Sequence, residues 1–278
     1  MKKKWLIFPF ILVLLLLLGG KSLVAADITK LPDQALLQTA YSGGESFRYT
    51  VSWMGVKAGE LLMEIEKKED KLDAYLIKIT AKSTGLLGVF YPVNDYFETE
   101  VAGTSRLPAT HLMIQNEGTR RNKKVTLYDQ SNFKVSYCKN EDPPKEYFLN
   151  GPVHNEFSSF FFMRTLPFAQ NDETMVPTFA DGKRHEVPVF MEGREMLRTI
   201  FGKKETIMVR PRLNFKGLYD KMGDPLVWFT EDDFRIPVKI KAKIVIGSLT
   251  TSLVDYHGPV GSPVMEEQPK YIEKEDPL

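Results

Sequence analysis

The sequence is poor in the residues that usually carry disulfide, metal and redox chemistry. Among 278 residues there is one cysteine, Cys138, and there are four histidines. One cysteine cannot form an internal disulfide, so burial of apolar side chains must stabilise the fold. The histidines lie in different segments without the short spacing of metal ligands; they are His111, His154, His185 and His257. We therefore expect no metal site and no cofactor.

The motifs of the large enzyme classes are also missing. The chain has no GxSxG elbow, no HExxH zinc motif, no CxxC pair, no glycine-rich phosphate loop and no EF-hand spacing. Asp232 and Asp233 could act as paired acids, but acidic residues at a hairpin tip are typical of turns. The sequence therefore names no catalytic residue, and it favours a binding protein over an enzyme.

No excess of basic residues is present. The whole chain has 37 basic and 36 acidic residues, with a net charge of +1. Removal of residues 1–26 would take away four lysines and no acid, which leaves 33 basic against 36 acidic residues and a net charge of −3. A nucleic-acid binder usually carries a concentrated basic patch, so we expect no nucleic-acid partner.

One long apolar run is present, and it lies at the N-terminus. Lys2, Lys3 and Lys4 precede the leucine-rich run Leu6–Leu18, and residues 24–26 (VAA) offer the small side chains that signal peptidase accepts. This pattern predicts a signal peptide at 1–26, cleavage after Ala26, and a periplasmic or secreted protein. An uncleaved anchor is the alternative, but the run is shorter than the roughly 20 residues that span a bilayer. We expect no stable membrane span after cleavage.

Alternation of apolar and polar residues dominates the rest of the chain. From Ile236 to Ile246 every second residue is apolar, with basic side chains mostly between them, which indicates a long half-buried strand. Leu226–Thr230 is expected to pair with it as a hairpin, and Ser248–Val254 to follow as the next strand. Pro237 lacks a backbone donor, so it predicts an edge or a bulge at that point.

Shorter alternating runs predict about a dozen strands in total. Further expected strands are Glu45–Met54, the runs around Met63 and Ile79, Tyr96–Val101, Thr110–Asn116, Lys123–Tyr128, Phe133–Cys138, Lys145–Leu149, Thr174–Phe179, Arg184–Met191, Glu195–Phe201 and Thr206–Pro211. Asp181-Gly182 and Glu192-Gly193 are dipeptides typical of tight turns. The short connections exclude the crossover helices of a parallel sheet, so the pattern predicts an antiparallel meander.

One segment after the signal peptide has helical spacing. In His154–Leu166 the residues Phe157, Phe160, Phe161 and Arg164 fall at i, i+3, i+4 and i+7. Asn155 can serve as the N-cap, and Pro167 follows the end. We expect this aromatic helix to plug one end of the curved sheet. The loop at 83–95 is expected to cap the sheet or to line a ligand entrance.

These patterns together predict an all-β, mainly antiparallel fold. We expect a strongly curved sheet or a partly open β-barrel with one short helix packed against it. The predicted organisation is a signal peptide at 1–26, an exposed leader at 27–44, a single β-rich domain at 45–257 and a disordered tail at 258–278.

Four stretches resemble a known family. They are GESFRYTVSWMGVKAGE at 44–60, NEFSSFFFMR at 155–164, DGK at 181–183, and the region from VWFTEDDFRIPVKI to IGS at 227–248. Together they resemble the bacterial exported family called domain of unknown function thirty-one-oh-eight. The resemblance implies a β-rich protein of the cell envelope, and it implies no established activity or catalytic residue.

The residues leave three function hypotheses open. The first is a carrier that holds an apolar or amphipathic lipid or glycan between sheet and helix, with Arg164 either on the ligand or at the helix dipole. The candidate ligand-binding residues are Trp53, Phe157, Phe161, Arg164 and Trp228. A filled interior with an exposed apolar patch would instead indicate a scaffold for an envelope protein partner. Converging carboxylates with raised pKa values would indicate an envelope hydrolase.

Overall fold

The computed structural model describes residues 32–169, 173–180, 182–212, 224–243 and 247–265. The predicted signal peptide lies outside these residues, as do 27–31 of the predicted leader and 266–278 of the predicted tail. The strands are β1 (Glu45–Trp53), β2 (Val56–Lys67), β3 (Ala74–Ser83), β4 (Asn94–Ala102), β5 (Leu107–Glu117), β6 (Arg120–Asp129), β7 (Lys134–Lys139), β8 (Lys145–Phe148), β9 (Glu173–Ala180), β10 (Lys183–Thr199), β11 (Gly202–Pro211), β12 (Leu226–Thr230), β13 (Pro237–Lys243) and β14 (Ser248–His257). The helices of the described residues are α1 (Gln34–Ala40), α2 (Gly85–Phe90) and α3 (Glu156–Met163).

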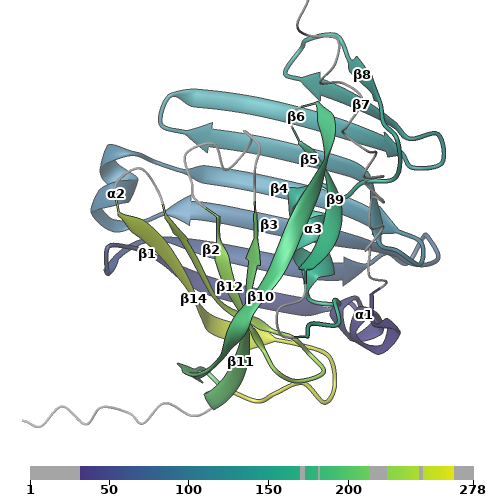
Figure 1. Cartoon of the computed structure of the whole chain (residues 1–278). Helices are drawn as coiled ribbons and strands as arrows, with labels where there is room; N and C mark the ends of the chain where they lie inside the picture. Colours follow the sequence, from purple (N-terminus) through teal and green to yellow (C-terminus); the bar gives the residue numbers. More distant parts are fainter. Residues whose placement is uncertain (1–31, 170–172, 181, 213–223, 244–246, 266–278) are drawn as a thin grey trace, which may run out of the picture.

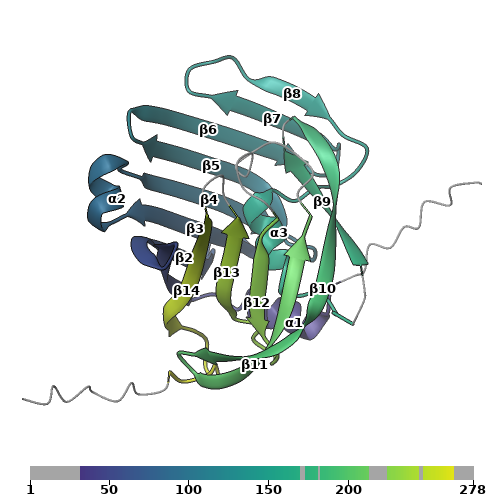
Figure 2. The ribbon, with the colours of Figure 1, turned by 60° about the vertical axis from the view of Figure 1, so that its left-hand side comes forward.

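All of these strands belong to one 14-stranded sheet. Its order is β8-β7-β6-β5-β4-β3-β2-β1-β14-β13-β12-β11-β10-β9, and the paired neighbours run antiparallel. Two meanders are therefore joined where β14 pairs with β1. The sheet curves strongly around its interior but does not close, because β8 and β9 remain its edges (Figures 1 and 2). The predicted fold class is confirmed.

The segment before α3 links the edge strand β9 to the turn between β6 and β7. The backbone N–H of His154 donates to the Pro177 carbonyl, and the N–H of Phe179 donates to the His154 carbonyl, both at 2.8 Å. On the other side the Gln130 amide bonds with both backbone groups of Val153, at 3.0 and 3.1 Å. A single extended segment thus links edge strand β9 to the turn between β6 and β7, while the sheet itself stays open.

The hairpin predicted around β12 and β13 is confirmed, and β14 follows as expected. Pro237 lies opposite Phe229, where the strand register shifts, so it occupies the predicted bulge. Ile236 and Val238 are buried and Ile240 is half-buried, as the alternation predicts. The expected positions of Ile244 and Ile246 lie outside the described residues.

The expected turn at Glu192-Gly193 is wrong. The strand β10 continues through it, and the register against β11 shifts between Met191 and Gly193. Gly193 has φ +154°, a conformation that glycine accepts at low cost, and it uses this freedom to form a bulge. The turn between β9 and β10 is where it was predicted, because Lys183 pairs with Ala180; its Asp181 lies outside the described residues.

The expectation of an exposed leader is wrong for its described part. Helix α1 begins after Asp33, whose carboxylate accepts hydrogen bonds from the N–H groups of Ala35 and Leu36. Leu37, Ala40 and Tyr41 are buried. Their i, i+3, i+4 spacing places them on one face, which packs into the core. Residues 258–265 contain no helix or strand, and the disorder expected for the tail stays a prediction.

The expectation of a single helix is also wrong, because α2 lies within the loop predicted at 83–95. Its Val89 and Phe90 are 76% and 82% exposed, so these side chains do not cap the core. The segment is only 6 residues long and has no clear apolar period, which explains why its helical form was not recognised.

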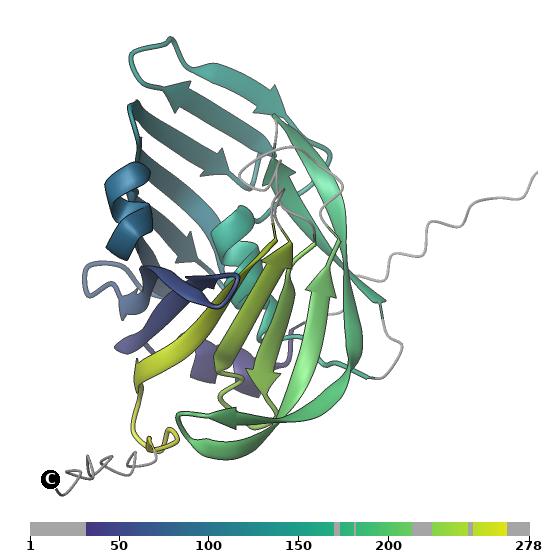
Figure 3. The same cartoon turned by 90° about the vertical axis from the view of Figure 1, so that its left-hand side faces the viewer.

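Helix α3 forms as predicted and lies inside the curve of the sheet (Figure 3). The Asn155 side chain accepts from the N–H groups of Phe157 and Ser158, and the Ser158 hydroxyl accepts from the Asn155 N–H. Phe157 and Phe161 join a core cluster with residues of β1–β4. Phe162 and its neighbours Met163 and Leu166 join a second cluster with residues of β9–β12. Each such burial contributes about 1.5–3 kcal/mol.

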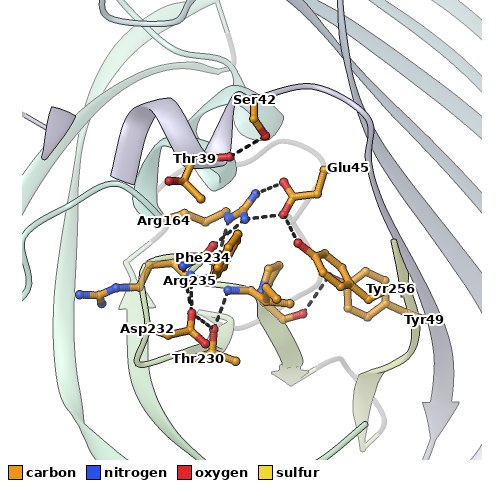
Figure 4. A network of polar contacts seen from close by, with 12 residues as sticks. Thr39, Ser42, Glu45, Tyr49, Arg164, Thr230, Asp232, Phe234, Arg235 and Tyr256 are labelled. Atoms are coloured by element: carbon orange, nitrogen blue, oxygen red, sulfur yellow. Dashed lines mark hydrogen bonds and ion pairs between the residues drawn. The ribbon is translucent and has the colours of Figure 1, made fainter. Parts of the chain in front are cut away.

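A buried ion pair fixes the C-terminal end of α3 (Figure 4). The Arg164 guanidinium binds both carboxylate oxygens of Glu45, at 2.8 and 2.9 Å, and both side chains are almost fully buried. Its remaining donors reach the backbone carbonyls of Phe234 and Arg235 at 2.8 and 3.0 Å. The Tyr256 hydroxyl donates to Glu45 at 2.9 Å. The helix is therefore tied to β1, to β14 and to the turn before β13.

Aromatic rings complete the surroundings of this ion pair. The guanidinium lies 5.1 Å from the centre of the Phe47 ring and 5.9 Å from that of Phe161. The Tyr49 hydroxyl donates to the Pro237 carbonyl at 2.8 Å beside it. Because the pair is hydrogen-bonded on all sides, loss of one partner would leave a buried charge without compensation.

We expect Arg164→Met to destabilise the protein by about 3–5 kcal/mol, because it leaves the Glu45 carboxylate buried with a single hydroxyl donor. Urea unfolding followed by circular dichroism measures the change. Arg194→Met is the matched control: its partner Glu231 lies near the surface, and the expected loss is at most about 1 kcal/mol. The double variant Glu45→Leu/Arg164→Met should regain stability relative to Arg164→Met. Equal losses from the two single variants would contradict a structural role for the buried pair.

Candidate functional site

The interior of the sheet changes character between its two halves. The inward positions of β1–β3 carry apolar side chains such as Phe47, Ile65 and Ile77, all fully buried. In the next strands the inward positions become polar. They carry Asp95 and Thr99 in β4, His111 and Gln115 in β5, Asn122, Lys124 and Thr126 in β6, and Tyr137 and Lys139 in β7. Such a concentration of inward polar side chains marks this half as a candidate site.

A cavity of about 690 Å³ lies against this polar half. Its volume is in the range of small-molecule sites. The walls come from β5, β6 and β7, from the first residue of α3, and from β8 and β9. The lining residues are Tyr91, His111, Met113, Gln115, Glu117, Arg120, Asn122, Lys124, Thr126, Tyr128, Tyr137, Lys139, Tyr147, Glu156, Phe179, Ala180 and Gly182.

Aromatic side chains form one wall of the cavity. Phe179 meets Tyr147 and Tyr128 edge-on, with ring centres 5.5 and 6.2 Å apart. This cluster also packs on Val135 and Val153, next to the segment that links β9 to the turn between β6 and β7. Burial raises the pKa of Tyr128 and of Tyr137, so both phenols stay neutral at physiological pH. The wall therefore offers ring faces together with hydroxyl groups.

His111 lies at the junction between the cavity and α3. Its Nδ1 lies 3.1 Å from the Glu98 carbonyl and 2.9 Å from the Thr99 hydroxyl, which in turn accepts from the N-cap residue Asn155 at 3.0 Å. Nδ1 is therefore protonated and donates to the Glu98 carbonyl. Nε2 has no hydrogen-bond partner among the described residues. Burial lowers the pKa of His111 to about 4, which keeps the ring neutral.

Two carboxyl groups meet beside the cavity. Asp95 is buried, and burial raises its pKa to about 6. This value includes a smaller upward effect of the neighbouring Glu117 and the downward effect of the Asn116 N–H, which donates to Asp95 at 2.7 Å. Two close carboxyl groups share a proton more readily than they carry two charges. Asp95 does not line the cavity, so this contact does not supply the converging carboxyl groups that the hydrolase hypothesis requires. The sequence indicated neither residue.

The acids that the sequence did indicate serve the turn before β13. Asp232 accepts from the Thr230 hydroxyl at 2.8 Å and from the N–H groups of Phe234 and Arg235 at 3.0 and 3.1 Å. These are the contacts of an Asx turn. Asp233 is exposed. The two carboxylates do not form an acid pair.

None of the five predicted ligand-binding residues lines the cavity. Phe157 and Phe161 pack in the core, and Arg164 forms the ion pair with Glu45. Trp228 is buried; its indole donates to Glu195, and the Lys239 amine lies 4.5 Å from the ring centre. Trp53 is half-exposed at the end of β1. Their role in ligand binding stays a prediction, and the structure places all five side chains away from the cavity.

Sequence reasoning missed the residues of the cavity because both faces of β6 are polar. Arg120, Asn122 and Lys124 face inward, while Arg121 and Lys123 alternate with them. A period of two with polar residues in both phases does not reveal which face is inside. One sequence feature could have indicated the inward face. Tyr128 is in phase with Lys124 on β6, and Tyr137 is in phase with Lys139 on β7.

Within the described part of the chain, no group of three or more His, Cys, Asp and Glu side chains is placed to hold a metal ion. The described helices also include none that is long and apolar enough to cross a membrane.

Comparison with known protein families shows to which family the chain belongs. Residues 48–254 match the family described as "Protein of unknown function (DUF3108)". The chain belongs to this family. The resemblance stated from the sequence motifs is thereby confirmed, and the exported character of the protein stays a prediction. No curated protein matches this DUF3108 protein.

Two solved structures match the DUF3108 protein at low sequence identity. One is the crystal structure of a β-barrel-like protein of domain of unknown function DUF1849 from Brucella abortus, with a TM-score of 0.55 at 8% identity, covering 78% of this chain and 98% of that one. The other is the hypothetical protein CT021 from Chlamydia trachomatis, with a TM-score of 0.36 at 6% identity, covering 86% of this chain and 100% of that one. The first likeness shows a shared barrel-like fold.

We expect the protein to lose stability as the pH falls from 6.5 towards 4, because the unfolded chain then binds protons that the buried His111 does not. Between pH 7 and pH 4.5 this difference amounts to about 2 kcal/mol for His111. The raised pKa of Asp95 increases the stability as the pH falls, which opposes the effect of His111. Comparison with a variant of His111 therefore isolates the contribution of this histidine. Urea unfolding at the two pH values should show a smaller loss for His111→Gln than for the wild type. An equal loss in both proteins would contradict a buried neutral His111.

Proposed function

We propose that this DUF3108 protein is an exported, non-enzymatic binding or carrier protein of the cell envelope. The observation that carries the proposal is the cavity of about 690 Å³ inside the open half of the barrel. Its walls combine tyrosine rings with amide, hydroxyl and charged side chains. Such a lining suits an amphipathic or glycan ligand, which presents both apolar surface and many polar groups.

The position of the cavity revises the binding mode proposed from the sequence. A lipid held between α3 and the sheet would need space beside Phe157 and Phe161, but these side chains are 9% and 0% exposed in a packed core. The polar half of the barrel has the space instead. We therefore place the ligand against β5–β8, with the aromatic wall around Phe179 on its apolar side.

The proposed location follows from the sequence. The basic start, the apolar run Leu6–Leu18 and the small residues that end at Ala26 favour export through a cleaved signal peptide. A ligand drawn from the cell envelope is consistent with that compartment.

One observation favours a second candidate function, a scaffold for another envelope protein. Met54 and Val56 at the turn between β1 and β2 are 67% and 69% exposed, and Val89 and Phe90 of α2 are exposed as well. The two segments are neighbours, because the N–H of Thr84 donates to the Ala58 carbonyl at 2.9 Å. Exposed apolar side chains that gather in this way are typical of protein contacts.

Native mass spectrometry of the protein purified from the periplasmic fraction of its own host tests the proposal. We expect a chain that begins at Asp27 and carries a lipid or glycan adduct. Tyr137→Ala should reduce the occupancy about tenfold or more, since removal of a contact worth about 1.4 kcal/mol has that effect. Phe90→Ser, which changes α2, is the matched control and should keep the adduct.

Two results would contradict the carrier. The first is the absence of any adduct on the wild-type protein, and the second is equal occupancy in wild type and Tyr137→Ala. A protein partner that is lost only in Phe90→Ser would establish the scaffold in its place. Circular dichroism of each variant separates these results from a failure to fold.

A further inference from the structure

We propose that the cavity binds a phosphate group of its ligand between Lys124 and Lys139. This inference rests on the proposed function, because it assigns the chemistry of the ligand in the same cavity. The phosphate can belong to a lipid headgroup or to a free phosphate ester, and both present the same oxygens to the protein.

The first observation is the register of β6 and β7. Lys124 is directly opposite Lys139 in the antiparallel pair, and both side chains line the cavity. Directly opposed residues on one face have Cβ atoms about 4.5–5.5 Å apart, and like charges there are destabilising. An anion between the two amines would relieve this repulsion.

The second observation is that the lysine pair has no direct ion-pair partner among the described residues, although Glu117 and Glu156 also line the cavity. Among the described residues neither Lys124 nor Lys139 forms an ion pair, although other half-buried lysines near acids do, such as Lys68 with Glu100 at 3.0 Å. Arg120, on the same face of β6 four residues before Lys124, forms no ion pair among these residues either. Three cations therefore face a cavity that two carboxylates, Glu117 and Glu156, also line, which leaves one positive charge in excess.

The third observation is the burial of Lys124. Burial lowers the pKa of Lys124, and the charges of Lys139 and Arg120 lower it as well. Glu156 and Glu117 act in the opposite direction, and their effect does not reverse the shift. The remaining titratable group on the neighbouring strand is His111, which is neutral. Burial is the main cause of the shift, so the Lys124 ammonium is poorly hydrated and would gain from a bound anion.

The uncharged neighbours complete a set of donors. Asn122 precedes Lys124 on the inward face of β6, and Tyr137 precedes Lys139 on the inward face of β7. Two ammonium groups, an amide and a phenol together provide more donors than a carboxylate can accept, whereas a phosphate has three oxygens to receive them. A phosphate therefore fits this set better than a carboxylate does.

Lys124→Gln tests the proposal, with Lys123→Gln as its control. Lys123 is the adjacent residue of β6, is exposed and alternates to the opposite face of the strand. The melting temperature of the mature protein is measured in phosphate-free buffer and with inorganic phosphate. Phosphate should raise the melting temperature of the wild type and of Lys123→Gln and leave that of Lys124→Gln unchanged. Without phosphate, Lys124→Gln should melt at the same temperature as the wild type or higher, because it removes a repulsion.

A second measurement distinguishes the source of the phosphate. Vesicles of phosphatidylcholine with phosphatidylglycerol, and phosphatidylcholine vesicles alone, are sedimented with each protein. Retention on the anionic vesicles that falls tenfold or more in Lys124→Gln and in Lys139→Gln indicates a lipid headgroup. A response to inorganic phosphate alone, with the same dependence on the lysines, indicates a soluble phosphate ester. Both outcomes support the site.

Three outcomes would overturn the inference. They are the absence of a response to either probe, equal binding by Lys124→Gln and the wild type, and a loss of stability in Lys124→Gln without phosphate. An uncharged adduct on the periplasmic protein that Lys124→Gln retains would also overturn it, while the proposed carrier function would stand. Phosphate binding in vitro by a protein that carries no adduct in its host would instead contradict the carrier function and leave the anion site in place.

Discussion

The buried ion pair between Glu45 and Arg164 is the interaction on which the rest of the structure depends. It joins the end of α3 to the first strand of the sheet, and the carbonyls of the turn before β13 and the Tyr256 hydroxyl complete its hydrogen bonds. Two charges without access to water are stable only when they are paired and hydrogen-bonded in this way, so the pair fixes how deep the helix lies within the barrel.

The position of α3 divides the interior into a packed half and a half that contains the cavity. Its phenylalanines fill the half bounded by β1–β3 and β9–β12, where the inward strand positions are mostly apolar. Its N-terminus, capped by Asn155, ends beside the inward polar residues of β5–β7 and leaves the cavity in front of them. In the proposed carrier, stability and binding thus come from separate strands of one sheet. The opposed lysines of the open half cost stability, and the packed half offsets that cost.

Much of the fold could be predicted because a period of two is a local property of the sequence. The hairpin of β12 and β13, the bulge at Pro237 and the capped helix after Asn155 all follow from residues near one another in the chain. The bulge at Gly193 could not be separated from a turn, because glycine with a positive φ serves both. The ion pair joins residues 119 positions apart, so no local sequence pattern predicts it. The cavity was missed because the two faces of β6 are alike in polarity, whereas most of the aromatic residues that suggested a site pack in the core.

Nuclear magnetic resonance of the mature protein, titrated with a lipid and glycan extract of the host cell envelope, tests the location of the site most directly. We predict that the backbone amide signals of β5–β7 and the ring signals of His111 shift, while those around Phe161 and Trp228 do not. Shifts confined to the packed core, or to the surface of α2, would contradict a binding site in the polar half of the barrel.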